Sequence, residues 1–140
     1  MLLTINGDRF VKDIQLDFSM AYPYLKLEFF RINGMHKNQA VKQNQVKHDQ
    51  QLRLAKGIDI KKGDLLIEDS MSVAELEKAF KDKFGLLTQV FRRSGNIWLE
   101  TTITDRWSLK QQNDLGKEIT MGRPEDKKTD EDYDLNRNED

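Results

Sequence analysis

The fold of this chain is decided by a stretch that occurs twice, LTINGDRFVKDIQLDFSMAYPYLKLEFFR at residues 3–31 and LLIEDSMSVAELEKAFKDKFGLLTQVFRR at residues 65–93. The two copies align without a gap at an offset of 62 residues. The apolar residues that meet are Leu3 with Leu65, Ile5 with Ile67, Val11 with Val73, Ile14 with Leu76, Phe18 with Phe80, Tyr22 with Phe84, Leu25 with Leu87 and Phe29 with Phe91. Self-similarity of this kind predicts one supersecondary unit used twice.

Each copy has the pattern of a strand, a helix and a second strand. Short apolar or alternating runs indicate the strands, and apolar spacings of three and four indicate the helices. The predicted elements are strand 2–5, helix 10–22, strand 24–31, strand 64–68, helix 72–84 and strand 86–93. Pro23 and Gly85 lie opposite each other in the alignment, where each helix must end. Ser72 and Glu75 have the spacing of a capping box at the start of the second helix.

Two more elements follow the second copy. Ser94-Gly95-Asn96 is a turn signal that joins strand 86–93 to a strand predicted over residues 97–104. Ser108 and Gln111 form a second candidate capping box, and Gly116 is a candidate helix stop. The sequence therefore predicts a strand hairpin and a short C-terminal helix over residues 109–115.

Two strand-helix-strand units in tandem favour parallel pairing within each unit, because right-handed crossovers then place both helices on one face of a single sheet. This element order resembles the ferredoxin-like fold over residues 2–104. We therefore predict an α+β domain over residues 1–121, in which a ferredoxin-like tandem repeat carries an added fifth strand and a short C-terminal helix. The strand order would be 2-3-1-4-5 in chain-order labels.

Strand alternation assigns side chains to the two faces of this sheet. The core face is predicted to carry Leu25, Leu27, Phe29, Leu87, Phe91, Leu99 and Ile103. The opposite face then carries Tyr24, Phe30, Arg92 and Trp98, which together make a candidate binding face. Such a face is covered either by the C-terminal helix, through Trp107 and Leu109, or by a partner, since large exposed apolar patches are usually interfaces.

Two segments are predicted to lie outside the packed core. Residues 34–51 are poor in apolar residues and indicate a long flexible loop, within a region of net charge +5 at residues 36–62. The candidate basic loop residues are Lys37, Lys42, Lys47 and Arg53. Residues 122–140 are predicted to form a disordered acidic tail, because residues 124–140 carry a net charge of −5 and almost no bulky apolar residues.

Composition excludes several classes of protein. The chain of 140 residues has no cysteine, which rules out disulfides, thiol nucleophiles and thiolate metal sites. A formal net charge of −1 gives no global attraction to nucleic acid or to anionic membranes. No window approaches the roughly 18 apolar residues of a spanning helix, and the N-terminus lacks the pattern of a signal peptide. We therefore expect a soluble cytoplasmic protein with no membrane partner.

The sequence carries no recognisable catalytic constellation. His36 and His48 are the only histidines, and no carboxylate lies at a spacing suited to a shared metal. Acidic residues near the predicted helix starts are explained by the helix dipole. These observations favour a non-enzymatic protein without metal or cofactor, with a small-ligand enzyme as the alternative.

Two binding functions remain as hypotheses. The first is a small binding or adaptor module that contacts an unidentified protein, or a second copy of this chain, through the candidate binding face or the loop. The alternative is a domain that binds single-stranded nucleic acid, with Tyr24, Phe30 and Trp98 as stacking residues and Arg92 and the loop lysines as phosphate contacts. Glu28 and Glu100, on the same predicted face, would repel phosphate.

Overall fold

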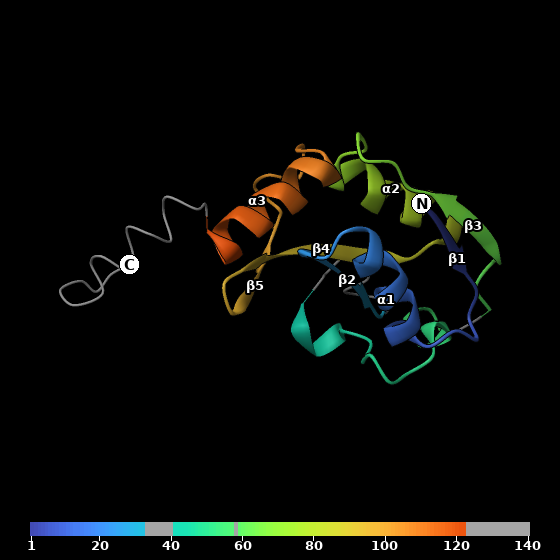
Figure 1. Cartoon of the computed structure of the whole chain (residues 1–140). Coiled ribbons are helices and arrows are strands. Elements are labelled where there is room, and N and C mark those ends of the chain that lie inside the picture. Colours follow the sequence, from blue (N-terminus) through green and yellow to red (C-terminus); the bar gives the residue numbers. More distant parts are fainter. Residues whose placement is uncertain (33–40, 58, 123–140) are drawn as a thin grey trace.

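The computed structural model describes residues 1–32, 41–57 and 59–122. Over these residues the chain has an α+β fold of five strands and three α-helices, with strand-helix-strand order in both copies as predicted (Figure 1). The strands are β1 (Leu2–Ile5), β2 (Leu25–Phe30), β3 (Gly63–Leu66), β4 (Leu87–Ser94) and β5 (Ile97–Glu100), and the helices are α1 (Val11–Ala21), α2 (Val73–Phe84) and α3 (Leu109–Met121). Two short 3₁₀ helices, Lys42–Asn44 and Leu52–Ala55, lie between β2 and β3.

The predicted helix caps are present. The Ser72 hydroxyl accepts a hydrogen bond from Glu75 N at 3.1 Å, and the Glu75 carboxylate accepts one from Ser72 N at 2.8 Å. Ser108 and Gln111 make the same reciprocal pair at the start of α3. Gly85 follows α2 with φ 67°, the left-handed conformation that glycine adopts without a steric penalty.

The strands form two antiparallel sheets, so the ferredoxin-like prediction of one sheet with order 2-3-1-4-5 is wrong. β1 pairs with β3, and β2, β4 and β5 form the second sheet in the order β2-β4-β5. Each strand of one copy pairs with the equivalent strand of the other, and Leu3 lies directly opposite Leu65. The periodicity of a sequence specifies which face of a strand is buried but not which strand lies beside it, so it could not decide between these pairings. The predicted hairpin between β4 and β5 is confirmed.

The repeat extends beyond the strand-helix-strand unit. After β2, the chain returns to the start of α1 and makes four backbone hydrogen bonds, Val11 N to Gln50 O, Lys12 N to His48 O, Leu52 N to Arg9 O and Arg53 N to Gly7 O. After β5, the chain returns to the start of α2 with the matching set, Val73 N to Trp107 O, Ala74 N to Asp105 O, Leu109 N to Met71 O and Lys110 N to Asp69 O. Free amides at the helix starts are thereby satisfied in the same way in both copies.

The gapless alignment fails after the two helices. Leu25, Leu27 and Phe29 are fully buried, whereas the residues at an offset of 62, among them Leu87 and Phe91, are only partly buried. The residues that are buried in the second copy lie at an offset of 61 from Leu25, Leu27 and Phe29. They are Leu86, directly before β4, and Thr88 and Val90 of β4. The second copy is one residue shorter between helix and strand, and a shift of one residue exchanges the faces of a strand. The prediction of Leu87 and Phe91 in the core was therefore wrong.

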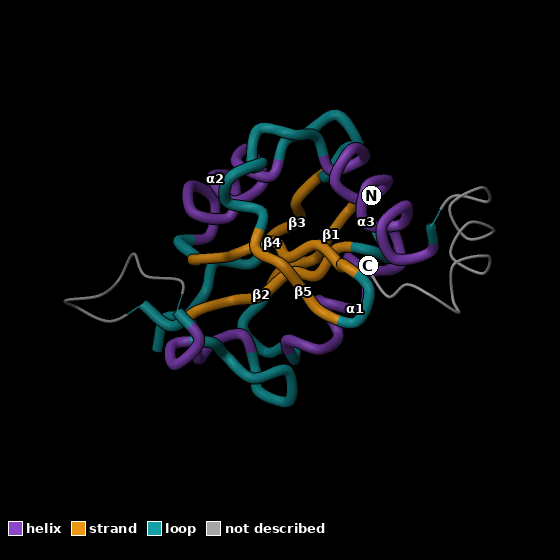
Figure 2. Tube along the Cα trace, turned by 90° about the vertical axis from the view of Figure 1, so that its left-hand side faces the viewer, coloured by secondary structure: helices purple, strands orange, loops and turns teal. Residues whose placement is uncertain are grey.

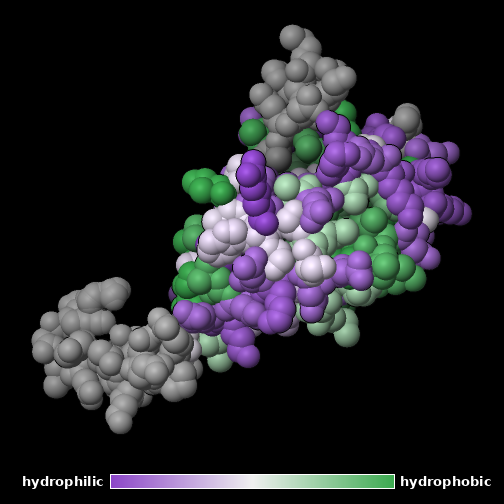
Figure 3. Space-filling view, turned by 90° about the horizontal axis from the view of Figure 1, so that it is seen from above, coloured by the Kyte–Doolittle hydropathy of each residue, from purple (hydrophilic) through white to green (hydrophobic). Residues whose placement is uncertain are grey.

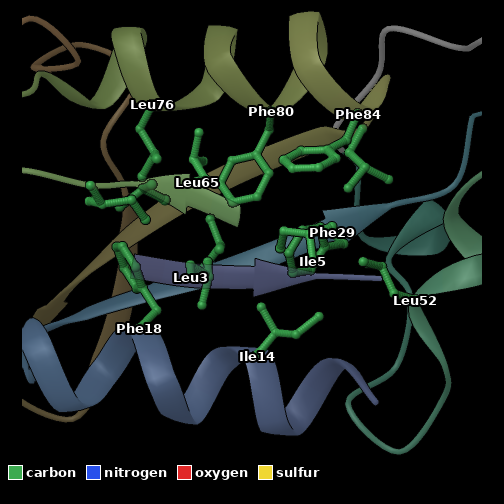
Figure 4. Packing of buried hydrophobic residues seen from close by; sticks show 14 of the residues in the cluster. Leu3, Ile5, Ile14, Phe18, Phe29, Leu52, Leu65, Leu76, Phe80 and Phe84 are labelled. Atoms are coloured by element: carbon green, nitrogen blue, oxygen red, sulfur yellow. The ribbon is translucent and has the colours of Figure 1, made fainter. Parts of the chain in front are cut away.

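The core lies between α1 and α2. Figure 4 shows Ile14 and Phe18 of α1 and Phe80 of α2 pointing toward each other across Leu3 and other strand residues. Phe29 and Phe80 meet edge to face, with 5.7 Å between ring centroids. Each such large side chain contributes roughly 1.5 to 3 kcal/mol when it is removed from water.

Helix α3 runs past its predicted end. Gly116 lies within the helix, where it allows a close approach: a Cβ atom on Gly116 would lie 2.9 Å from Tyr24 Cβ and 3.0 Å from Arg92 Cγ. The predicted strand 97–104 ends at Glu100, before Ile103. Leu99 and Ile103 are 38% and 98% exposed, so the prediction that they belong to the core was wrong.

The described part of the predicted loop packs on the body of the protein. Val46 is fully buried, and its N–H donates to Phe29 O at 2.8 Å. Leu52 and Ile60, farther along, are buried as well. Residues 34–40 of the predicted loop and residues 123–140 of the predicted tail lie outside the described residues. In the described ranges, no helix is both long and apolar enough to cross a membrane.

Candidate functional site

The candidate site is a groove on the face of the β2-β4-β5 sheet that points away from the core. Its volume is about 330 Å³, and its lining combines aromatic and charged side chains. The lining residues are Lys26, Glu28, Phe30, Lys42, Gln45, Phe91, Trp98 and Glu100. We refer to these eight residues as the sheet groove.

Strand register explains how the sheet groove is assembled. Lys26 of β2 lies opposite Phe91 of β4, and Phe91 lies opposite Glu100 of β5. Residues directly opposite each other in an antiparallel pair share a face, so these three side chains form one row across the sheet. Trp98 lies two residues before Glu100 and so on the same face, beside Arg93. The sheet therefore carries cation, aromatic ring and anion side by side.

Lys26 lies at the centre of the site. Its Nζ atom is 3.1 Å from Glu28 Oε2, and it lies over the rings of Phe91 and Trp98, with distances of 5.6 and 5.1 Å to their centroids. Cations are attracted to the negative faces of aromatic rings. The ammonium group therefore links the two rings to a carboxylate, and it fixes the wall of the groove.

Glu28 is a buried carboxylate whose oxygens are both engaged. The residue is 5% exposed, and Gln15 of α1 donates from Nε2 to Glu28 Oε1 at 2.9 Å. Lys26 neutralises the other oxygen. A buried charge is tolerated when it is paired and hydrogen-bonded, so this carboxylate belongs to the framework of the groove.

The far wall comes from the segment after β2. Gln45 forms an antiparallel bridge with Phe30, which is 1% exposed. Arg31 supports the same segment, because its guanidinium donates to Gln43 O at 2.6 Å and its N–H donates to Asn44 O. Lys42 is exposed at the rim.

The structure brings together two of the four residues of the predicted binding face. Phe30 and Trp98 line the sheet groove, whereas Tyr24 and Arg92 lie under α3. The Tyr24 N–H donates to Asn113 Oδ1 at 2.8 Å, and Arg92 Nη1 donates to Gln112 Oε1 at 2.7 Å. The one-residue shift in β4 turned Arg92 toward the helices. The C-terminal helix packs on Tyr24 and Arg92, and none of its residues lines the groove. Of the two residues predicted to cover the face, Leu109 is buried in the core cluster and Trp107 is 41% exposed.

Sequence reasoning missed Phe91 and the central place of Lys26. The missing signal was the pairing of β4 with β2, which places Phe91 opposite Lys26. The lysines and arginine of the predicted basic loop are not gathered at one place. Lys42 lines the groove, whereas Arg53 forms an ion pair with Asp8 in a separate hollow. Lys47 is exposed, and Lys37 lies outside the described residues.

Comparison of the chain with protein-family models, with curated proteins and with solved structures finds no match. Among the described residues, no group of three or more histidine, aspartate and glutamate side chains is placed to hold a metal ion. What the sheet groove offers chemically is apolar contact with aromatic rings beside charges of both signs.

Proposed function

We propose that this protein is a small binding module that holds a segment of a partner protein in the sheet groove. The observation that carries the proposal is the convergence of two half-buried aromatic side chains, Phe91 of β4 and Trp98 of β5, on one groove with a charged rim. Phe30, which is 1% exposed, lines the same groove as part of its framework. Aromatic anchors surrounded by polar groups are the usual centre of a protein interface.

The groove is preorganised, which favours binding. Lys26 and Glu28 restrain each other and the two aromatic rings before any partner arrives. Side chains that are already fixed lose less conformational entropy when a partner binds. Phe91 and Trp98 are half-buried, so each retains surface that a partner can cover.

The rim indicates the chemistry of the partner segment. Lys42 and Glu100 are exposed and lie at the rim of the groove. A complementary segment would place an apolar side chain against Phe91 and Trp98, with an acidic residue toward Lys42 and a basic residue toward Glu100. Opposite charges placed this way favour one orientation of the segment over the reverse.

Binding of single-stranded nucleic acid has less support in the site. Of the three predicted stacking residues, Tyr24 lies under α3 and Phe30 is 1% exposed, which leaves Trp98. The charge of Lys26 is already paired with Glu28, and Glu100 would repel a phosphate chain.

The test is selection from a displayed library of random peptides, followed by measurement of affinity for variants of the full chain. We expect selected peptides to shift the indole N–H signal of Trp98 and not that of Trp107, which lies outside the groove. Trp98→Ala should weaken binding by about tenfold or more, as for an interface anchor, and Trp107→Ala is the matched control.

Peptides that bind Trp98→Ala as tightly as the natural chain would contradict the proposal. A saturable shift of Trp98 by a pool of short single-stranded oligonucleotides, with affinity falling steeply as salt rises, would replace it with the nucleic-acid alternative.

A further inference from the structure

The edge strands of this protein differ in how their outer backbone groups are satisfied. On the outer edge of β2, Phe29 O accepts from Val46 N and Leu27 O accepts from Gln15 Nε2. In the two-stranded sheet the cover is partial: Thr4 O accepts from Arg9 and Asp64 O accepts from Lys83, whereas the outward groups of Leu2 and Leu66 make no hydrogen bond to a described residue. Covering edges in this way prevents them from pairing with another chain.

The outer edge of β5 has no such cover among the described residues. Arg93 N donates toward β2, to Tyr24 O at 2.9 Å, so the N–H and C=O groups of Arg93 point away from β5. Trp98 lies directly opposite Arg93 and Glu100 lies two residues on, so the backbone groups of both point outward. Neither residue makes a backbone hydrogen bond on that side to any described residue.

The sequence of β5 offers little protection of its edge beyond its short length and Glu100. Its four residues, Ile97-Trp98-Leu99-Glu100, include neither proline nor lysine. Ile97 and Leu99, on the face opposite the sheet groove, are 57% and 38% exposed. Figure 2 looks onto this end of the molecule, where β5 is the strand nearest the viewer.

More exposed apolar surface lies beside this edge. The end of α3 is held at the β4-β5 turn, where Gly95 N donates to Thr120 Oγ1. The neighbours of Thr120, Ile119 and Met121, are 47% and 45% exposed. In Figure 3, hydrophobic residues are exposed at this end of the molecule, near the point where the described chain stops.

We propose that β5 pairs antiparallel with β5 of a second copy of this chain, with the twofold axis at Leu99. Trp98 would then lie opposite Glu100 of the second copy, and the reverse, so that four backbone hydrogen bonds form between the outward groups. Leu99 would face Leu99 of the second copy in the close, non-hydrogen-bonded position. The two three-stranded sheets become one sheet of six strands.

Charge complementarity supports a second copy as the occupant. In this register, one row across the joined sheet runs Lys26, Phe91 and Glu100, then Trp98 and Arg93 of the second copy. Each Glu100 then lies between two aromatic rings, with a cation beyond each ring. The pairing also covers Leu99. It does not rest on the proposed function, because it uses the backbone edge of β5.

A cysteine crosslink tests the register, and the chain has no cysteine that could interfere. Leu99→Cys would place the two thiols on the twofold axis, with about 4.5 Å between Cα atoms, within the range of a disulfide. We expect most of this variant to become a covalent dimer under mild oxidation. Ile97→Cys is the matched control: the two copies of residue 97 would lie roughly 13 Å apart, too far for a bond.

The mass in solution tests the pairing without a new bond. We expect light scattering of the natural chain at millimolar concentration to approach twice 16.4 kDa. Glu100→Pro removes one outward donor without removing a bond to β4, and it should return the mass to one chain. Glu100→Ala removes the carboxylate but keeps the donor, so it should weaken the dimer without abolishing it. A single-chain mass for the natural protein, or equal crosslinking of Leu99→Cys and Ile97→Cys, would overturn the proposal.

Discussion

Gln15 and Glu77 occupy equivalent positions in α1 and α2, 62 residues apart, and each hydrogen-bonds the strand that follows its own helix. Gln15 Nε2 donates to Leu27 O at 2.7 Å, whereas Glu77 Oε2 accepts from Val90 N at 3.0 Å. The same position therefore joins helix to strand in both copies, with a neutral amide in one and a carboxyl group in the other. Burial raises the pKa of Glu77 to about 7, and the negative charge of Asp105 adds to the shift.

This shift predicts how stability depends on pH. The pKa of Glu77 lies near 4.5 in an unfolded chain and near 7 in the folded one, so the folded state binds the proton more tightly. The stabilisation is complete below about pH 4.5 and is lost as pH rises through about 7. Glu77→Gln should remove this contribution to the pH dependence and raise the free energy of unfolding at pH 8 relative to the natural chain.

Urea unfolding at pH 5 and pH 8 measures the effect. Gln keeps an oxygen that accepts from Val90 N, so the hydrogen bond survives the substitution. Glu75→Gln is unsuitable as a control because Glu75 belongs to a capping box, and Asp82→Asn, on the exposed side of the same helix, is the better one. A natural chain and Glu77→Gln variant with parallel pH profiles would contradict the prediction.

A hydrogen bond between Tyr22 of the first copy and Asp69 of the second has no counterpart at the equivalent positions. Tyr22 Oη donates to Asp69 Oδ1 at 2.8 Å, and burial together with this bond raises the pKa of Tyr22 above its usual range. The equivalent of Tyr22 in α2 is Phe84. Tyr22→Phe should therefore pack normally but lower the free energy of unfolding by about 1 to 2 kcal/mol.

Chemical denaturation of Tyr22→Phe, of Asp69→Asn and of the double variant gives the interaction free energy of the pair, apart from the effect of each substitution alone. Met20→Ala is the control, because Met20 is 74% exposed on the same helix and should change the free energy by less than about 0.5 kcal/mol. Equal stability of Tyr22→Phe and the natural chain would show that the hydrogen bond contributes nothing net.

The elements of this fold could be predicted because their signals are local. Apolar spacings predicted both helices of the repeat, and the spacing of Ser72 and Glu75 predicted the start of α2. The sheet arrangement could not be predicted, because pairing of β1 with β3 depends on contacts between residues about 60 positions apart. Parallel and antiparallel arrangements bury the same side chains of a strand, so periodicity is satisfied by either.

The candidate site was predicted in part for the same reason. Trp98 and Phe30 could be assigned to the open face from alternation alone. Phe91 and Arg92 were assigned to the wrong faces of the sheet, because the second copy is one residue shorter after α2. The apolar residues of the two copies still align without a gap, so the sequence does not reveal this change. Gly116 was taken as a helix stop, since nothing in the sequence indicates the approach of Tyr24.

Gln112 should be the most sensitive polar residue of α3. It is fully buried, its Nε2 donates to Thr104 O at 2.6 Å, and its Oε1 accepts from Arg92 Nη1 at 2.7 Å. Gln112→Ala leaves a partly buried guanidinium without this acceptor, which should cost about 1 to 3 kcal/mol of stability. Thermal unfolding against Gln111→Ala, which removes only half of a capping box at the exposed helix start, measures the difference.

Gly116→Ala tests whether α3 is docked as tightly as the contacts indicate. In an exposed helix this substitution stabilises, because alanine has about 1 kcal/mol better helix propensity than glycine. Here the new Cβ atom would lie 2.9 Å from Tyr24 Cβ and 3.2 Å from Tyr24 O, so the helix must move away from β2 and β4. We expect a net loss of about 1 to 3 kcal/mol. Lys117→Ala, one residue on and exposed, should change little. A gain in the unfolding temperature of Gly116→Ala would mean that α3 does not hold this position against the sheet.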